Sequence, residues 1–150
     1  MQRKLRGHEY MQAHVNVNEY DGSETLYSYD TAVISKFYGT FNNKTVQMVS
    51  CTGLYSRTTI KHISLYLREN GISYYLVKAI AGATGWVLVL DDESNPYVAT
   101  YYNLITGEVR TIETPIKHSV LKKLAKYFEA DQSLYYDGWD MHWRHSVWGY

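Results

Sequence analysis

The chain has 150 residues, of which 45% are apolar and 20% charged, a balance typical of a globular protein rather than a disordered one. Its formal net charge of zero disfavours a strongly basic nucleic-acid binder and a strongly acidic DNA mimic. The single cysteine, Cys51, excludes a disulfide within the chain, and the absence of a signal peptide agrees with a reducing cytoplasm as the expected location. The longest apolar run, Trp86–Leu90, is too short to cross a bilayer, so we expect no membrane contact.

The first part of the chain is expected to form strands. Residues 1–11 should be poorly ordered or lie at a sheet edge. Apolar and polar residues then alternate over residues 13–17, which is the pattern of a half-buried strand. Turn signals at Asp21-Gly22 and in residues 39–44 separate further strand-like runs, and we expect these at residues 25–29, 32–38 and 45–51.

A helix should follow these strands. Apolar residues recur at helical spacing between Ile60 and Leu67, which indicates one buried face. Ser56 or Thr58 is suited to be the N-cap, and Asn70-Gly71 is a typical C-terminal signal. We therefore expect a helix between these two boundaries.

The second half of the chain repeats the order of strands and then a helix. We expect strands at residues 73–80, 85–90, 97–104 and 108–113, the last two joined by a hairpin across Thr106-Gly107. Thr114 can cap a helix whose first position is Pro115. The apolar stripe of that helix consists of Ile116, Val120, Leu121, Leu124, Tyr127 and Phe128.

Short connections between strands favour antiparallel pairing, and amphipathic helices need an apolar surface to cover. The sequence therefore predicts an α+β fold with a mainly antiparallel sheet and two helices packed on one face, in the order strands, helix, strands, helix. We expect one domain over residues 1–150, in which residues 131–150 form an aromatic-rich tail.

Two short motifs in the first half resemble those of a known group of proteins. They are Ser28-Tyr29-Asp30-Thr31-Ala32-Val33 and Tyr55-Ser56-Arg57-Thr58-Thr59 followed by His62. The combined pattern, Ser-Tyr-x-Thr-x-Val and Tyr-Ser-x-Thr-Thr-x-x-His, is similar to one found in small uncharacterised proteins of bacteriophages. The resemblance covers residues 25–70. It implies a phage origin and a strand-hairpin-helix unit, and it brings no catalytic residues with it.

The second motif also contains a candidate anion-binding site. A hydroxyl-rich turn that enters a helix presents backbone N–H groups at the positive end of the helix dipole. The residues that could contribute are Ser56, Arg57, Thr58, Thr59 and His62. The alternative is ordinary capping, in which the hydroxyls satisfy the first amides of the helix and bind nothing else.

The tail carries a candidate surface for a partner protein. Trp, Tyr and Arg dominate the energetics of protein interfaces, and here the predicted contacts are Tyr135, Tyr136, Trp139, Trp143 and Trp148. Alternatively, these rings fold back and complete the core.

The same tail holds a pair of histidines that could share a metal ion. His142 and His145 are spaced for one face of a helix, and Asp137 or Asp140 could add a ligand. Two histidines without a fixed third ligand do not define a zinc site, so we predict no metal and no cofactor.

Basic residues give a third candidate surface, one that would contact phosphates of a nucleic acid. They are Arg3, Lys4, Arg6, Lys117, Lys122, Lys123 and Lys126. A solvated helix face is the alternative explanation for the lysines. Cys51 lies in an apolar strand end and is expected to be a buried small residue rather than a nucleophile.

Together these features predict a non-enzymatic phage accessory protein that binds a host protein in the host cytoplasm, for instance an anti-CRISPR inhibitor of a bacterial defence nuclease. A nucleic-acid-binding phage protein is one alternative. A small phosphate-binding protein or enzyme centred on Thr58, Thr59 and His62 is another. A homodimer is also compatible with the aromatic tail.

Overall fold

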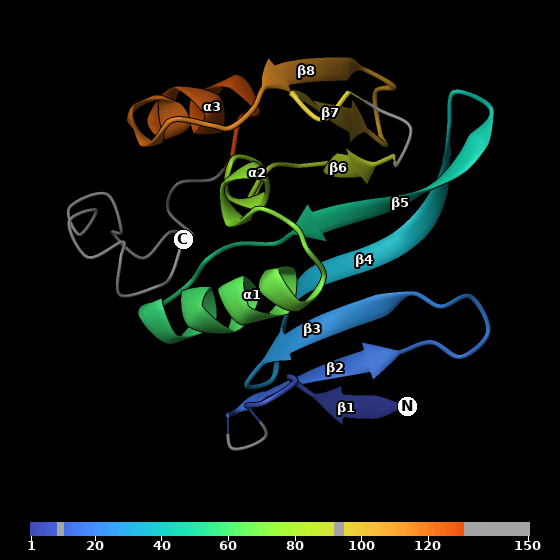
Figure 1. The fold of residues 1–150 in the computed structure, drawn as a ribbon, viewed down its shortest axis with the longest axis vertical. Coiled ribbons are helices and arrows are strands. Elements are labelled where there is room, and N and C mark those ends of the chain that lie inside the picture. Colours follow the sequence, from blue (N-terminus) through green and yellow to red (C-terminus); the bar gives the residue numbers. More distant parts are fainter. Residues whose placement is uncertain (9–10, 92–94, 131–150) are drawn as a thin grey trace.

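The computed structural model of the chain describes residues 1–8, 11–91 and 95–130. These residues form one antiparallel sheet of eight strands, in which each strand pairs with its neighbours in the sequence (Figure 1). The strands are β1 (Gln2–Lys4), β2 (Ala13–Val17), β3 (Glu24–Ser28), β4 (Thr31–Phe41), β5 (Lys44–Cys51), β6 (Trp86–Leu90), β7 (Val98–Asn103) and β8 (Val109–Glu113).

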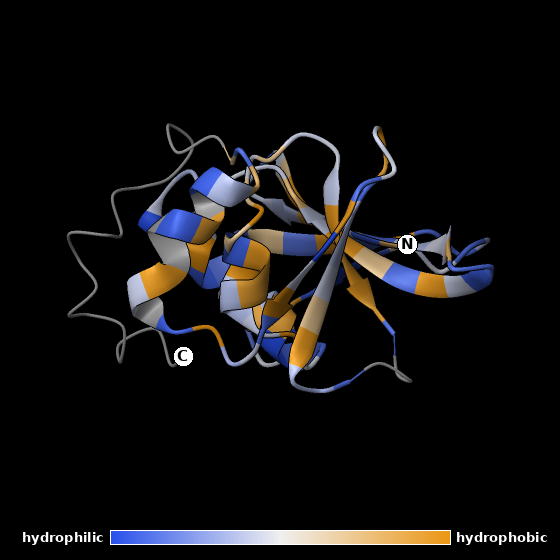
Figure 2. Cartoon of the chain, turned by 90° about the horizontal axis from the view of Figure 1, so that it is seen from above, coloured by the Kyte–Doolittle hydropathy of each residue, from blue (hydrophilic) through white to orange (hydrophobic). Residues whose placement is uncertain are grey.

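The helices interrupt and follow this meander. Helices α1 (Arg57–Glu69) and α2 (Tyr74–Lys78) lie between β5 and β6, whereas the 3-10 turn η1 (His118–Val120) and helix α3 (Leu121–Tyr127) follow β8. Figure 2, which looks along the sheet from above, shows the helices on one side of it. The predicted α+β class, with an antiparallel sheet covered by helices on one face, is confirmed.

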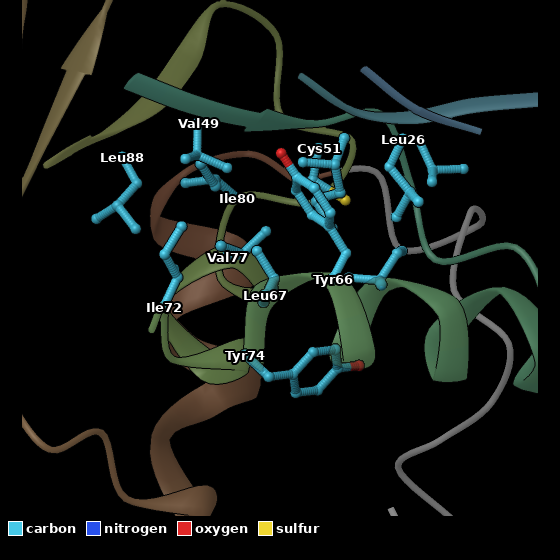
Figure 3. Packing of buried hydrophobic residues seen from close by; sticks show 14 of the residues in the cluster. Leu26, Val49, Cys51, Tyr66, Leu67, Ile72, Tyr74, Val77, Ile80 and Leu88 are labelled. Atoms are coloured by element: carbon cyan, nitrogen blue, oxygen red, sulfur yellow. The ribbon is translucent and has the colours of Figure 1, made fainter. Parts of the chain in front are cut away.

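Alternation along the strands explains the main core between sheet and helices. Side chains on a strand point to opposite faces in turn, and Val49 and Leu88 point toward the helices, where Leu67 and Val77 meet them (Figure 3). Each fully buried aliphatic side chain of this kind contributes about 1.5–3 kcal/mol to folding. The helix-side cluster is therefore the main source of stability.

A second, smaller cluster lies on the helix-free face. Val46, Met48 and Val87 alternate with the residues of the main core and are buried together with Phe41. Gly39 makes room for this cluster, because a Cβ atom there would lie 2.7 Å from the sulfur of Met48. The sheet is thus apolar on both faces at its centre.

The hairpin between β4 and β5 is tighter than the sequence suggested. Asn42 and Asn43 both have positive φ, of 51° and 63°, as a two-residue type I′ turn requires. The strands continue to Phe41 and from Lys44. The loop expected over residues 39–44 is therefore largely strand.

The strand expected at residues 73–80 is wrong, because the structure has helix α2 there. Tyr74, Val77 and Ile80 are buried and recur every three residues, so a helix can bury all three against α1 and β5. The β-branched and aromatic residues of this segment favoured a strand locally, but packing against the core decided the outcome.

The helix start expected at Thr114 and Pro115 is also wrong. The backbone N–H of Thr114 donates to the carbonyl of Tyr97 at 2.9 Å, and its hydroxyl donates to the carbonyl of Pro96 at 3.0 Å. These bonds extend the β7–β8 pairing by one residue, so the turn η1 begins only at His118.

The two edges of the sheet are β1 and β8, which lie at opposite ends of the molecule (Figure 1). An edge strand was one of two expectations for residues 1–11, and Leu5 and Met11 next to it are buried. Among the described helices, none is long and apolar enough to pass through a membrane.

Candidate functional site

The two sequence motifs meet where β3 ends and α1 begins. The hydroxyl of Ser28 lies 2.8 Å from Nδ1 of His62 and 3.0 Å from the hydroxyl of Thr59. Strand β3 and helix α1 are therefore joined by a buried polar network. The motifs are separated by the β4–β5 hairpin in the sequence and are brought together only by the fold.

Ser56 connects this network to the end of the helix. Its side chain accepts a hydrogen bond from the backbone N–H of Thr59 and donates one to the Thr59 hydroxyl, both at 3.2 Å. Ser56 is thus the N-cap of α1, as one of the two predicted caps, and replacing such a cap by alanine usually costs about 1 kcal/mol.

The network is buried between β3 and α1. Ser28 and His62 each expose only 2% of their surface, so a substrate could not reach either without parting the strand from the helix. Burial lowers the pKa of His62, and the positive charges of Lys61 and Lys4 lower it further. His62 therefore stays neutral near pH 7 and can keep its hydrogen bond to Ser28.

Two tyrosines lie at the surface directly above this network. Tyr29 follows Ser28 and Tyr55 precedes Ser56, and the two residues are 52% and 40% exposed. The Tyr29 ring is 5.8 Å from the ring of His62. The Tyr55 hydroxyl donates to the hydroxyl of Thr52 at 2.9 Å.

Both tyrosines have an unusual backbone conformation. Tyr29 has a φ of 56° and Tyr55 a φ of 58°, which places them in the left-handed region that bulky residues avoid at a cost of about 1–2 kcal/mol. Strained residues of this kind persist where the surrounding structure holds them and cluster at functional sites. Here the N–H of Tyr29 donates to the carbonyl of Gln12 at 2.8 Å, and the N–H of Ser56 donates to the carbonyl of Leu54 at 2.7 Å, across Tyr55.

The residues around the two rings complete a polar and aromatic surface, which we call the tyrosine patch. Thr52 joins the segment after β5 to strand β4, because its hydroxyl donates to the carbonyl of Ala32 at 2.9 Å. Exposed Tyr side chains among hydroxyl groups resemble the composition of antibody paratopes. The patch consists of Tyr29, Asp30, Thr31, Thr52, Tyr55 and Thr58, all exposed.

A model of one protein family matches the chain over residues 3–80, slightly more than half of its length, and is described as a family of unknown function, DUF8033. The chain belongs to this family. The part of the DUF8033 chain that is matched runs from β1 through α2 and contains the whole tyrosine patch. No curated protein and no solved structure matches the chain.

In this DUF8033 chain, most of the predicted anion site is engaged in the network. Ser56, Thr59 and His62 bond to one another or to Ser28. The hydroxyl of Ser56 accepts from a helix N–H, as the capping interpretation predicted, whereas that of Thr59 bonds to the hydroxyls of Ser28 and Ser56. Thr58 lies at the surface and Arg57 is half-buried. Anion binding at this helix stays a prediction, and it could draw only on Arg57, Thr58 and backbone amides.

The predicted nucleic-acid contacts fall into two groups that lie far apart. At one edge, Arg3 forms ion pairs with Glu69 at 2.5 Å and with Glu24 at 3.5 Å. Lys4 donates to the carbonyl of Met11 at 2.9 Å, and Arg6 is exposed. These bonds direct the charges of Arg3 and Lys4 toward the protein itself.

The lysines of the second group follow β8 at the other edge. Lys117, Lys123 and Lys126 are exposed, and the side chain of Lys122 lies outside the described residues. The two edges are separated by the width of the sheet, at about 4.8 Å per strand. The structure therefore does not bring the two groups into one basic surface.

The predicted contacts in the tail lie outside the described residues, so that surface stays a prediction. The same holds for the metal ligands considered in residues 137–145. Within residues 1–8, 11–91 and 95–130, no group of three or more His, Cys, Asp or Glu is placed to hold a metal ion. Cys51 is buried, and burial raises the pKa of its thiol to about 12.

Sequence reasoning missed the exposed tyrosines of the patch. Tyrosine is common in strands and cores, and Tyr66 in α1 and Tyr101 in β7 are fully buried. The available signal was the position of Tyr29 and Tyr55 beside Ser28 and Ser56 at the ends of the two motifs. A turn residue next to a capping or network residue is a better candidate for exposure than one inside a strand.

Proposed function

We propose that this protein is a non-enzymatic accessory protein of a bacteriophage that binds a protein of the bacterial host through the tyrosine patch. One observation carries the proposal: two exposed tyrosines, Tyr29 and Tyr55, have left-handed backbone conformations and lie next to Ser28 and Ser56, whose side chains belong to a buried hydrogen-bonded network. The resemblance of both motifs to those of phage proteins supports the phage origin.

The physical argument is preorganisation. Association costs about 0.5–1.5 kcal/mol for each side chain that must be ordered at an interface. Tyrosine has only two side-chain torsions, and the backbone of Tyr29 is already anchored through Ser28 to Thr59 and His62. Such a surface loses little entropy when a partner covers it, which is what a dedicated binding protein needs.

The finer form of the proposal is an inhibitor of a bacterial defence nuclease, of the anti-CRISPR type. An inhibitor of this kind needs only to cover a working surface of its target. The polar and aromatic patch supports such a role, and so does the burial of Ser28 and His62, which keeps them from acting on a substrate.

A photo-crosslinking amino acid at position 29 or 55 tests the proposal in host lysate. The matched control places it at Tyr20, which is fully exposed and lies outside the patch. We expect positions 29 and 55 to capture the same host protein and position 20 to capture none of it. Equal capture from position 20, or different proteins from 29 and 55, would contradict the assignment of the patch.

A second arm separates the patch from the tail. The double variant Trp139→Ala/Trp143→Ala carries the crosslinker at position 29. If the patch is the binding surface, capture persists in this variant and is lost when Tyr55 is replaced by alanine. Loss of capture in the tail variant alone would move the site to the tail.

A further inference from the structure

The outer strand β8 presents backbone groups along one side that pair with no other strand of the described residues. The N–H of Asn103 donates to the carbonyl of Glu108 and the N–H of Thr114 donates to that of Tyr97, both at 2.9 Å. In an antiparallel ladder, hydrogen-bonded pairs alternate with pairs that are not hydrogen-bonded. The register therefore directs the backbone groups of Arg110 and Ile112 toward β7.

The residues between them direct their backbone groups away from the sheet. These are Val109, Thr111 and Glu113, and no described residue bonds to their N–H or C=O groups. Ile112 packs against the main core on the helix side. By alternation, the side chains of Val109, Thr111 and Glu113 lie on the helix-free face.

The other edge of the sheet is protected in the way that natural edges usually are. Strand β1 has three residues and carries Arg3 and Lys4, and short, charged edges resist pairing with another chain. Strand β8 has five residues, and Val109 at its start is exposed. On the same hairpin, Ile105 is 71% exposed. The β8 edge is therefore the one suited to strand addition.

We propose that β8 pairs with β8 of a second copy of this chain, antiparallel and about a two-fold axis at Thr111. The outward-facing residues are symmetric about that position, so each finds a partner: Thr111 pairs with the partner's Thr111, and Val109 pairs with the partner's Glu113. A two-fold axis perpendicular to the sheet keeps the helices of both copies on the same side. The interface is isologous, as in most dimers.

Charge disfavours two of the other registers. An axis at Arg110 would place two arginines directly opposite each other, and an axis at Glu113 would do the same with two glutamates, which destabilises a cross-strand pair. With the axis at Thr111, Arg110 instead faces the partner's Ile112. Glu108 then lies opposite the partner's Thr114.

The overall charge of the chain also favours a second copy as the occupant. With a formal net charge of zero, two copies do not repel each other at long range, and proteins near zero net charge associate more readily. The threonine pair at the axis adds a favourable cross-strand contact.

Disulfide trapping of the full chain tests the register. Across the axis, the two Thr111 Cα atoms should be about 5.5 Å apart, within the range that a disulfide spans. We expect Thr111→Cys to form a covalent dimer on mild oxidation, and Val109→Cys/Glu113→Cys to do the same. Glu113→Cys alone and Tyr20→Cys should not. The native Cys51 is buried and should not compete.

Sedimentation analysis supplies a second readout. Thr111→Pro removes an outward N–H without breaking a bond to β7, so we expect it to sediment as a monomer, whereas Thr111→Val keeps the N–H and should remain a dimer. A wild-type chain that is monomeric at all concentrations would overturn the proposal, as would trapping at position 113 or 20 that equals that at 111. Replacing Tyr29 should leave the dimer intact. The proposed dimer and the proposed function of the tyrosine patch can therefore be refuted separately.

Discussion

Helices α1 and α3 are attached to the same sheet by different kinds of contact. Helix α1 is tied to the sheet by polar bonds of defined direction along its length. The C-terminal end of helix α3 is held by rings that surround one phenylalanine. The comparison shows that the position of α1 on the sheet is fixed by directional bonds, whereas α3 is held mainly by the burial of apolar surface.

The bonds of α1 begin at its first turn and continue to its end. His62 bonds to Ser28, the hydroxyl of Tyr66 donates to Glu24 at 2.8 Å, and Asn70 accepts from Lys36 at 2.6 Å. Hydrogen bonds have directional requirements, so these contacts fix the position of the helix along the strands. The tyrosine patch depends on that position, because Tyr55 is anchored at the start of the helix.

The attachment of α3 is mainly aromatic, with one hydrogen bond from the guanidinium of Arg110 to the carbonyl of Tyr127. Phe128 is fully buried, with its ring 4.6 Å from that of Tyr101 and 5.1 Å from that of Trp86. The guanidinium of Arg110 lies over the rings of Trp86 and Tyr127, at 4.8 and 4.3 Å. Stacking and cation–π contacts tolerate small shifts, so this attachment stabilises the helix without defining a surface as closely.

The largest effect should come from removing the ring at the centre of the α3 attachment. Phe128→Ala deletes a fully buried side chain, and we expect the free energy of unfolding to fall by about 3–5 kcal/mol in urea titration. Tyr127→Ala is the control, because that ring is exposed and should cost less than half as much. A loss at Phe128 no greater than that at Tyr127 would show that α3 does not depend on this stack.

A smaller effect should follow from breaking the polar attachment of α1. Ser28→Ala leaves His62 and Thr59 without their shared partner, which should cost about 1–3 kcal/mol. Ser64→Ala is matched to it, since Ser64 is also buried on α1 but bonds only to the carbonyl of Ile60 in its own helix. If the two variants lost equal stability, the bonds of Ser28 to His62 and Thr59 would contribute no more than a hydrogen bond within the helix.

The dependence of stability on pH should also reveal the attachment of α1 through His62, with a smaller change in the free energy of unfolding. The pKa of His62 is lowered in the folded state by burial and by Lys61 and Lys4, whereas the unfolded chain takes up a proton near pH 6.5. The contribution of His62 is therefore present above about pH 6.5 and is lost as the pH falls below that value.

Urea titrations between pH 5 and pH 7 should show this loss in the wild type and a flatter profile in His62→Gln. Ser64→Ala, which removes a buried hydroxyl of the same helix and no titratable group, should keep the wild-type slope. A slope unchanged by His62→Gln would mean that another group causes the acid sensitivity.

Periodicity and turn residues predicted most of the fold, because they act locally. The helix from its Ser56 cap to the stop at Asn70-Gly71 was correct, and the alternation in residues 13–17 and the hairpins located most strands. The strand expected at 73–80 failed because burial of Tyr74 and Val77 against α1 outweighed the β-propensity of the segment.

The candidate site was less predictable, because it depends on contacts distant in the sequence. Both motifs were identified, but nothing local shows that Ser28 reaches Thr59 and His62, which lie more than thirty residues further along the chain. The left-handed backbone of Tyr29 and Tyr55 could not be expected either, since tyrosine disfavours it. Only the folded arrangement of β3 and α1 shows that Tyr29 and Tyr55 are exposed whereas other tyrosines are buried.

The most direct measurement is the affinity of the captured host protein for Tyr29→Gly and Tyr55→Gly. Glycine accepts the left-handed conformation without strain, so we expect the free energy of unfolding to change by less than about 1 kcal/mol. The account predicts that the dissociation constant nevertheless rises at least about tenfold for each variant, while Tyr20→Gly leaves it unchanged. Affinity that is unchanged in both patch variants, with the fold intact, would contradict the central claim that these two rings are the binding surface.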